Sequence, residues 1–281
     1  MTASNDHVAR TAGATVITVD NGAVTRRRDN LAGEEPLQIL AAGPDQAPVE
    51  VAVTMRTPGH EADLAIGFLI TEGLAAPNDI DRVTLADPAT ASRPDDSVVV
   101  HLRRALDVTL IAERRTVATA SCGICGTASI DDIVRRCEPL PDGPTMDPAI
   151  LPQLPGRLRA AQETFESTGG LHASGLFDTI GELMLLREDV GRHNALDKVI
   201  GASAVTNALP LHGTILLMSG RVSFELVQKA AAAGIPILVA VGAPTDLAVD
   251  TAAAVGMTLV GFLRGERFNV YSRPDRLGLS A

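Results

Sequence analysis

The chain has 281 residues, 46% of them hydrophobic, which is enough to bury a substantial core divided between two domains. Its formal net charge of −10 argues against a surface that coats nucleic acid, because such a surface needs basic patches. Three cysteines, an odd number, do not make a disulfide framework, and no apolar stretch is long enough to span a bilayer. We therefore expect a cytoplasmic protein that binds neither nucleic acid nor membranes.

The first half of the chain predicts strands and turns with one clear helix. Segments 14–19 and 23–28 flank Asp20-Asn21-Gly22, a strong hairpin signal. Apolar residues alternate over 49–55 as in a half-buried strand, and a helix is expected over 58–72, with a glycine ending it. Further strands are expected at 82–86, 98–102 and 108–112.

The stretch 139–155 carries six of the chain's 17 prolines, too many for a core element, and predicts the domain boundary. Residues 1–140 then form a mainly antiparallel β domain with one helix and a cysteine loop, and residues 141–281 form the second domain. There, short apolar strands alternate with helices, as in a largely parallel sheet covered on both faces. The expected helices are 156–167, 193–203, 223–233 and 245–255, and the expected strands are 171–177, 182–186, 215–218, 237–241, 258–263 and 268–271.

The order of elements in the second domain resembles the core of the cytidine-deaminase-like fold, a three-layer α/β/α architecture. Ligands bind to such sheets at the carboxyl ends of the strands. We therefore expect the loops at 219–221, 242–244 and 264–267 to line any site.

The most informative motif is the pair Cys122 and Cys125, in a Cys-x-x-Cys loop flanked by glycines that leave both sulfurs accessible. Residues 127–137 predict a short helix whose dipole points its positive end at this loop and favours thiolate over thiol. The same spacing occurs in redox dithiols and in half of a zinc site. Zinc needs two more ligands, and Cys137 falls on the buried face of the predicted helix. The residues favour sulfur chemistry, with a metal site as the alternative.

Three further segments carry polar groups where a site would form. His172 follows a glycine turn, although a lone histidine is more often structural than catalytic. Segment 187–198 gathers charged and imidazole side chains, including Arg192 and His193, around a helix start, where capping with ion pairs and an anion site are both open. Two arginines, Arg264 and Arg267, surround a glycine turn that forms either a phosphate site or a surface hairpin.

Several of these motifs recur together in one known family. The segments concerned are 55–61, 68–73, 121–126, 168–173, 188–198, 219–221 and 261–262. In this combination and order, from about residue 15 to 275, the chain resembles the FdhD/NarQ family of sulfur carrier proteins, or sulfurtransferases, needed for formate dehydrogenase activity.

The resemblance implies a cytoplasmic protein, typically a homodimer, that takes sulfur from a cysteine desulfurase. It delivers this sulfur to molybdenum bis(molybdopterin guanine dinucleotide) before the cofactor enters formate dehydrogenase. Cys122 corresponds to the family's persulfide cysteine, while Cys125 either resolves the persulfide or tunes Cys122. GDP is the expected analogue of the bound cofactor, and no resident metal is expected. The family's cofactor segment falls on Phe262, Leu263, Arg264, Gly265, Glu266 and Arg267.

Two other functions compete with sulfur transfer. A zinc-dependent nucleobase deaminase needs H-x-E at one helix start and P-C-x-x-C at the next. The corresponding starts at 191–195 and 219–222 retain only His193, which disfavours deamination. A non-catalytic chaperone that shields the guanine-dinucleotide cofactor keeps the nucleotide site without sulfur transfer, and it is the alternative function.

Overall fold

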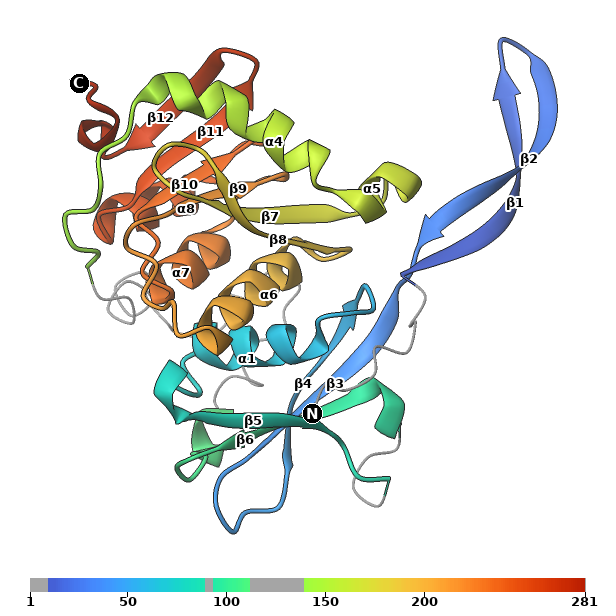
Figure 1. Cartoon of the computed structure of the whole chain (residues 1–281), viewed down its shortest axis with the longest axis vertical. Coiled ribbons are helices and arrows are strands. Elements are labelled where there is room, and N and C mark those ends of the chain that lie inside the picture. Colours follow the sequence, from blue (N-terminus) through green and yellow to red (C-terminus); the bar gives the residue numbers. More distant parts are fainter. Residues whose placement is uncertain (1–9, 89–92, 112–138, 281) are drawn as a thin grey trace.

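The computed structural model describes residues 10–88, 93–111 and 139–280. Within them, a four-stranded and a six-stranded sheet lie on either side of two packed helices, α1 (Glu61–Thr71) and α6 (Arg192–Val205) (Figure 1). A two-stranded hairpin projects from this body as a separate arm. The expected α/β fold, with a mainly β first half and an α/β/α second half, is confirmed.

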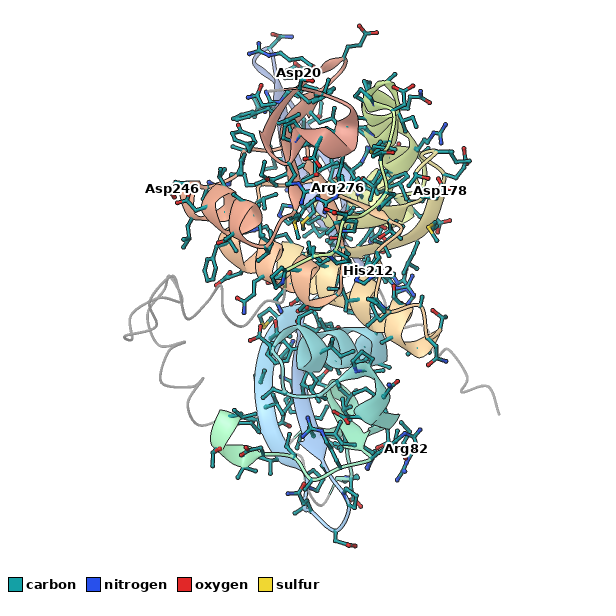
Figure 2. The ribbon with its side chains drawn as sticks, turned by 90° about the vertical axis from the view of Figure 1, so that its left-hand side faces the viewer. Asp20, Arg82, Asp178, His212, Asp246 and Arg276 are labelled. Carbon is teal, nitrogen blue, oxygen red and sulfur yellow. The ribbon has the colours of Figure 1, made fainter. Side chains whose placement is uncertain are left out.

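The projecting arm consists of β1 (Thr11–Asp20) and β2 (Ala23–Ala32), paired antiparallel with Asp20 opposite Ala23. Its turn residues Asn21 and Gly22 have φ angles of 48° and 84°, as a two-residue type I′ turn requires. This confirms the hairpin predicted from Asp20-Asn21-Gly22. In the side view of Figure 2, Asp20 marks one end of the molecule and Arg82, in the four-stranded sheet, the other.

The four-stranded sheet has the order β4-β3-β6-β5 and is covered on one face by α1. Strand β3 pairs antiparallel with β4 and parallel with β6, and β5 pairs antiparallel with β6. A strand was predicted at 108–112, but its described part, residues 108–111, is helical, because Asp107 accepts hydrogen bonds from the backbone N–H and hydroxyl of Thr109. The elements are β3 (Glu35–Ala42), β4 (Val49–Arg56), η1 (Pro77–Asp79), β5 (Ile80–Leu85), η2 (Pro94–Asp96) and β6 (Ser97–Leu102).

The six-stranded sheet has the order β12-β11-β10-β9-β7-β8. Only the pairs β9–β10 and β10–β11 are parallel, whereas β7 runs antiparallel to both of its neighbours and β12 runs antiparallel to β11. The prediction of a largely parallel sheet was therefore wrong. The sheet is mixed, because an antiparallel hairpin forms each of its two edges. Its strands are β7 (His172–Phe177), β8 (Leu183–Asp189), β9 (Ile215–Met218), β10 (Ile237–Ala240), β11 (Thr258–Arg264) and β12 (Arg267–Ser272).

Helices cover both faces of this sheet and produce three layers. Leu216 and Leu238 face α6, α7 (Phe224–Ala232) and α8 (Asp246–Ala254) in one core. Their neighbours along the strands, Leu217 and Val239, face the opposite core. The elements on that side are η3 (Pro148–Gln153), α4 (Leu154–Ala160), α5 (Glu163–Thr168) and η4 (Pro274–Leu277).

The single helix expected over 156–167 is two helices, α4 and α5, separated at Ala161 and Gln162. The second helix begins where the carboxylate of Glu188, from β8, accepts hydrogen bonds from the backbone N–H groups of Thr164 and Phe165 at 3.1 and 2.9 Å. This cap from a neighbouring strand satisfies N–H groups that a continuous helix would have bonded internally.

Helix α1 is apolar on both sides and joins the two sheets. Leu64 and Leu69 contribute to the core of the four-stranded sheet, and Ile66 and Ile70 to the core beneath α6. A methyl group on Gly67 would lie 1.8 Å from the carbonyl oxygen of Asp197 in α6. Only glycine permits the two helices to cross this closely.

Candidate functional site at the strand ends

The loops that follow β9 and β10 meet a bulge in β11 and form what we call the strand-end edge, comprising residues 219–222, 242–244 and 261–262. The N–H of Gly242 donates to the carbonyl of Gly220 (3.1 Å), and the N–H of Phe262 donates to the carbonyl of Gly242 (3.0 Å). A methyl group on Gly242 would lie 2.7 Å from the Gly220 oxygen. The predicted loops 219–221 and 242–244 are thus brought into direct contact.

The third predicted loop forms the turn between β11 and β12. Arg264 lies opposite Arg267, and Gly265 occupies the turn with a φ angle of 56°. Both arginines and Glu266 are exposed, and within the described part of the chain neither arginine has a carboxylate partner. The cationic tip therefore has hydrogen-bond donors available for a ligand.

The predicted cofactor segment also contains one core residue. The side chain of Leu263 is buried among the residues beneath α4, so only its backbone is available to a ligand. Phe262, by contrast, is 39% exposed at a register shift in the β11–β12 pairing and has a φ angle of 55°. The bulge gives this residue a backbone conformation that is uncommon outside glycine and leaves its ring at the surface beside Gly242.

His172 and Arg192 lie beside Gly220 at the same edge. A methyl group on Gly220 would be 3.3 Å from Nδ1 of His172 and 3.9 Å from Cδ of Arg192. Burial and the nearby Arg192 guanidinium lower the pKa of His172, with the Asp189 carboxylate opposing them, so its imidazole is neutral near pH 7. Nε of Arg192 is buried without a hydrogen-bond partner among the residues described. These groups give the edge one neutral imidazole and one cation.

His193 reaches the next helix along the chain. Its Nε2 lies 2.9 Å from Oε2 of Glu225 and 3.4 Å from the hydroxyl of Ser223. The hydrogen bond from His193 lowers the pKa of Glu225. Glu225 was not among the predicted site residues, although an acidic residue in the first helical turn after the 219–222 loop is a signal that could have indicated it.

Much of segment 188–198 has a structural role, in a buried polar network formed by Thr57, Asp189, Asn194 and Lys198. Nζ of Lys198 lies 2.7 Å from Oδ2 of Asp189 and donates to the carbonyl of Thr57 at 2.9 Å. The amide of Asn194 donates to Oδ1 of Asp189 and to the carbonyl of Met55. Burial lowers the pKa of Lys198, and Asp189 opposes this effect. The network ties α6 to the end of β4.

A second buried ion pair links three helices. Nζ of Lys229 in α7 lies 2.9 Å from Oδ2 of Asp197 in α6, 3.0 Å from Oε1 of Glu72 and 2.8 Å from the hydroxyl of Thr71. Burial alone would lower the pKa of Lys229, but the carboxylates of Asp197 and Glu72 raise it overall. Arg192 and His193 take part in neither of these networks, and Arg192 lies beside Gly220 at the strand-end edge.

The predicted persulfide residues, Cys122 and Cys125, lie outside the described residues, as do Cys137 and the helix predicted over 127–137. The described chain stops at Ile111, which is buried in the core of the four-stranded sheet. It resumes beside α8, where the N–H of Leu140 donates to the carbonyl of Val255 at 2.9 Å. The described residues on either side of the cysteine-containing segment thus pack against the body.

The described residues contain no group of three or more histidine, cysteine, aspartate or glutamate side chains that could hold a metal ion. Within the same part of the chain, no helix is long and apolar enough to cross a membrane.

The sequence model of the FdhD/NarQ family matches residues 32–278. The chain belongs to the FdhD/NarQ family. A protein named "Sulfur carrier protein FdhD" from Streptomyces coelicolor is 48% identical over 275 residues, covering 95% of each chain. Proteins of the same name from Nocardia farcinica and Mycobacterium tuberculosis are 47% and 44% identical and cover 95% and 90% of this chain.

A solved structure shares the fold. The crystal structure of a protein from Desulfotalea psychrophila, assigned as a formate dehydrogenase accessory protein, matches with a TM-score of 0.74. It covers 96% of this chain and 100% of its own length at 23% sequence identity. The whole α/β architecture, including both sheets, is therefore an arrangement found in a solved protein.

Proposed function

We propose that this protein is a sulfur carrier for the maturation of formate dehydrogenase. In this proposal Cys122 accepts persulfide sulfur from a cysteine desulfurase, and the sulfur passes to molybdenum bis(molybdopterin guanine dinucleotide). The observation that carries the proposal is the 44–48% identity, over nine-tenths or more of the chain, to proteins named as sulfur carriers. The presence of the Cys-x-x-Cys loop in this chain supports it.

The loading step is a thiol exchange. The Cys122 thiolate attacks the outer sulfur of a persulfide on the desulfurase and forms a new S–S bond, while the desulfurase cysteine leaves as a thiolate. Cys122 then carries one additional sulfur atom as its own persulfide. A thiolate at Cys125 has the chemistry to release this sulfur as HS⁻ with formation of a Cys122–Cys125 disulfide, which a thiol must then reduce.

The acceptor carries two guanine dinucleotides, and its phosphates need cations and N–H donors. We place them at the strand-end edge and the adjoining turn, where Phe262 is exposed and where Arg264 and Arg267 have no carboxylate partner among the described residues. Guanidinium groups match phosphate geometry with paired hydrogen bonds. Arg192 and the neutral His172 add donors beside Gly220. We further propose that the protein acts in the cytoplasm as a homodimer.

Mass spectrometry after incubation with a cysteine desulfurase and cysteine tests the loading step. We expect the mass of one sulfur atom to be added at Cys122, and Cys122→Ala to abolish both this addition and activation of the client formate dehydrogenase. Cys137→Ala is the matched control, and it should retain both activities. Normal loading and activation by the Cys122 variant would refute the assignment.

The same experiment separates the carrier from the alternative, a chaperone that only shields the cofactor. A chaperone would acquire no sulfur, and its Cys122→Ala variant would still bind the guanine dinucleotide and activate the client. Loading of sulfur followed by its transfer to the cofactor is expected only of the carrier.

A further inference from the structure

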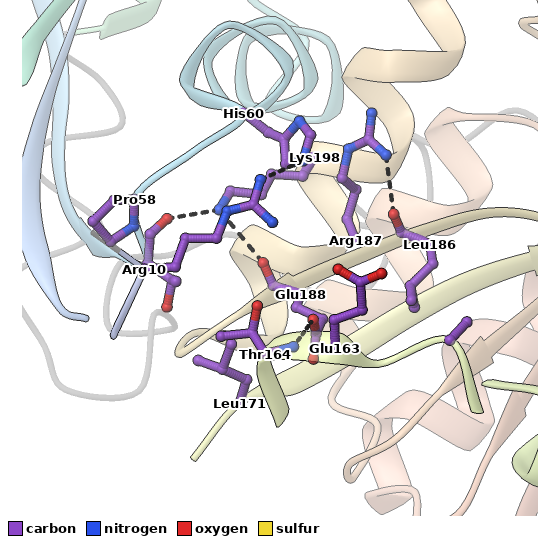
Figure 3. A pocket seen from close by; sticks show the side chains of 12 residues that line it. Arg10, Pro58, His60, Glu163, Thr164, Leu171, Leu186, Arg187, Glu188 and Lys198 are labelled. Atoms are coloured by element: carbon purple, nitrogen blue, oxygen red, sulfur yellow. Dashed lines mark hydrogen bonds between the residues drawn. The ribbon is translucent and has the colours of Figure 1, made fainter. Parts of the chain in front are cut away.

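A small cavity lies where the base of the projecting arm meets α1, α5 and β8 (Figure 3). Its volume is about 150 Å³, and none of its lining residues belongs to the strand-end edge. Pockets for drug-sized ligands measure about 300–1,000 Å³, so this cavity fits a molecule of only a few heavy atoms. Its charged or titratable lining residues are Arg10, His60, Glu163, Arg187, Glu188 and Lys198.

Three of these side chains already make strong contacts within the protein. Arg187 donates to Oδ2 of Asp63 through Nε and a terminal nitrogen, at 3.0 and 2.8 Å. Lys198 belongs to the buried polar network, and Glu188 caps the start of α5. These groups shape the cavity but have little capacity to hold a ligand.

Two opposite charges remain, Arg10 and Glu163. Within the described residues Arg10 makes one side-chain hydrogen bond, to Nε2 of His60 at 3.1 Å, and Glu163 has no ion pair or side-chain hydrogen bond. Figure 3 shows Arg10 and His60 on one side of the cavity and Glu163 with Glu188 on the other. An unpaired cation thus faces an unpaired carboxylate across a space of metabolite size.

His60 holds Arg10 in place. Burial, with Arg187 and Arg10 nearby, lowers the pKa of His60 to about 4, so the imidazole is neutral near pH 7. A guanidinium only donates, so Nε2 must accept and Nδ1 must carry the proton, 3.5 Å from Oδ2 of Asp63. The residue has a φ angle of 62°, an uncommon conformation outside glycine that is often found at ligand sites.

We propose that this cavity binds a small zwitterionic α-amino acid. Its carboxylate would pair with the Arg10 guanidinium, its ammonium with the Glu163 carboxylate, and a short aliphatic side chain would contact Leu171 and Leu186 in the cavity wall. A zwitterion pairs with both charges at once, whereas a simple anion or amine pairs with only one of them. The proposal does not depend on sulfur transfer.

Calorimetric titration of the full chain with L-alanine and L-valine at neutral pH tests the site. We expect saturable binding with one ligand per chain, and weaker binding of propionate and ethylamine, which each lack one of the two charges. Arg10→Ala and Glu163→Gln should each lower the affinity for the amino acid about tenfold or more, because each removes a charge-assisted hydrogen bond.

Arg26→Ala on the exposed arm and Glu166→Gln, an exposed residue of α5, are the matched controls and should bind as the wild type does. Unchanged melting temperatures without ligand would show that the variants are folded. Absence of saturable binding for both amino acids would overturn the proposal. Propionate binding as tightly as L-alanine, with no loss in Glu163→Gln, would also overturn it, because the site would then be one for simple anions. Sulfur loading at Cys122 should be unaffected in Arg10→Ala, so the two proposals fail independently.

Discussion

The buried polar network and the strand-end edge use charged and polar residues from one short stretch of sequence for opposite purposes. In the network, the side chains of Lys198 and Asp189 are 1% and 0% exposed and lie 2.7 Å apart. At the edge, Arg192 begins the same helix, yet its Nε has no partner among the described residues. The difference is whether the protein itself supplies the counter-charge.

This difference separates stability from binding. A buried ion whose partners are all internal fixes the position of its helix, and it has no donors left for a ligand. A cation without an internal partner contributes little to folding and is available to a phosphate. Variants in the two regions should therefore affect different measurements, and a variant that affected both would show that the regions are not separable.

Lys198→Met should produce the largest effect. It leaves Asp189 buried without its cation, and loss of one partner of a buried pair costs about 3–5 kcal/mol of the free energy of unfolding. Denaturant titration measures this cost. Arg192→Ala, in the same helix, is the matched control and should cost less of the free energy of unfolding, because it leaves no buried carboxylate without its cation.

A double variant sharpens the test of the buried pair. Asp189→Asn combined with Lys198→Met removes both charges, so its cost should be smaller than the sum of the two single costs. Strict additivity, or a Lys198→Met variant as stable as Arg192→Ala, would mean that the pair does not hold α6 against β4.

Sequence patterns predicted the helices and strands well where the residues that determine them are close together in the chain. The Asp20-Asn21-Gly22 turn and the alternation of strands and helices after residue 215 are confirmed. Strand β3 (Glu35–Ala42) was missed, because its central position gives it buried residues in succession rather than in alternation. The break between α4 and α5 depends on Glu188, more than twenty residues away, so no local pattern could have revealed it.

The site could be predicted only in part for the same reason. The convergence of loops 219–221 and 242–244 follows from strand direction, and the structure places them together. The internal roles of Asp189, Asn194 and Lys198 depend on Met55 and Thr57, more than 130 positions earlier in the chain. Sequence spacing therefore identified a polar helix start but could not divide its residues between structure and binding.

Replacing both Arg264 and Arg267 by alanine should affect binding without affecting stability. Each substitution removes charge-assisted hydrogen bonds worth about 1.5–3 kcal/mol, so the affinity for GDP should fall at least about tenfold. Calorimetric titration with GDP measures the loss. The free energy of unfolding should stay within about 0.5 kcal/mol of the wild-type value, because both side chains are exposed.

Two results would contradict this assignment of the phosphate site. Unchanged GDP affinity would move the phosphates away from the turn, towards Arg192 and His193 at the start of α6. A large loss of stability would show that the turn is part of the structural framework. Persulfide formation at Cys122 should survive in the double variant, because loading and cofactor binding use different residues.

The smallest expected effect, and the most specific, concerns His60. Its side chain is 37% exposed, yet it shares the cationic surroundings of the buried network. Its pKa falls from 6.5 to about 4 on folding, chiefly through burial and then through Arg187 and Arg10. Between these values the unfolded chain binds more protons, so the contribution of His60 to stability is complete above pH 6.5 and is lost as the pH falls towards 4. The melting temperature of His60→Asn should therefore fall less than that of the wild type over this range, since asparagine tolerates the φ angle of 62° without titrating.

Expressing each melting temperature relative to its value above pH 6.5 removes the effects that do not titrate. Equal losses in the two proteins would mean that burial, Arg187 and Arg10 do not lower the pKa of His60 in the folded protein, and the arrangement described for this side of the network would be wrong.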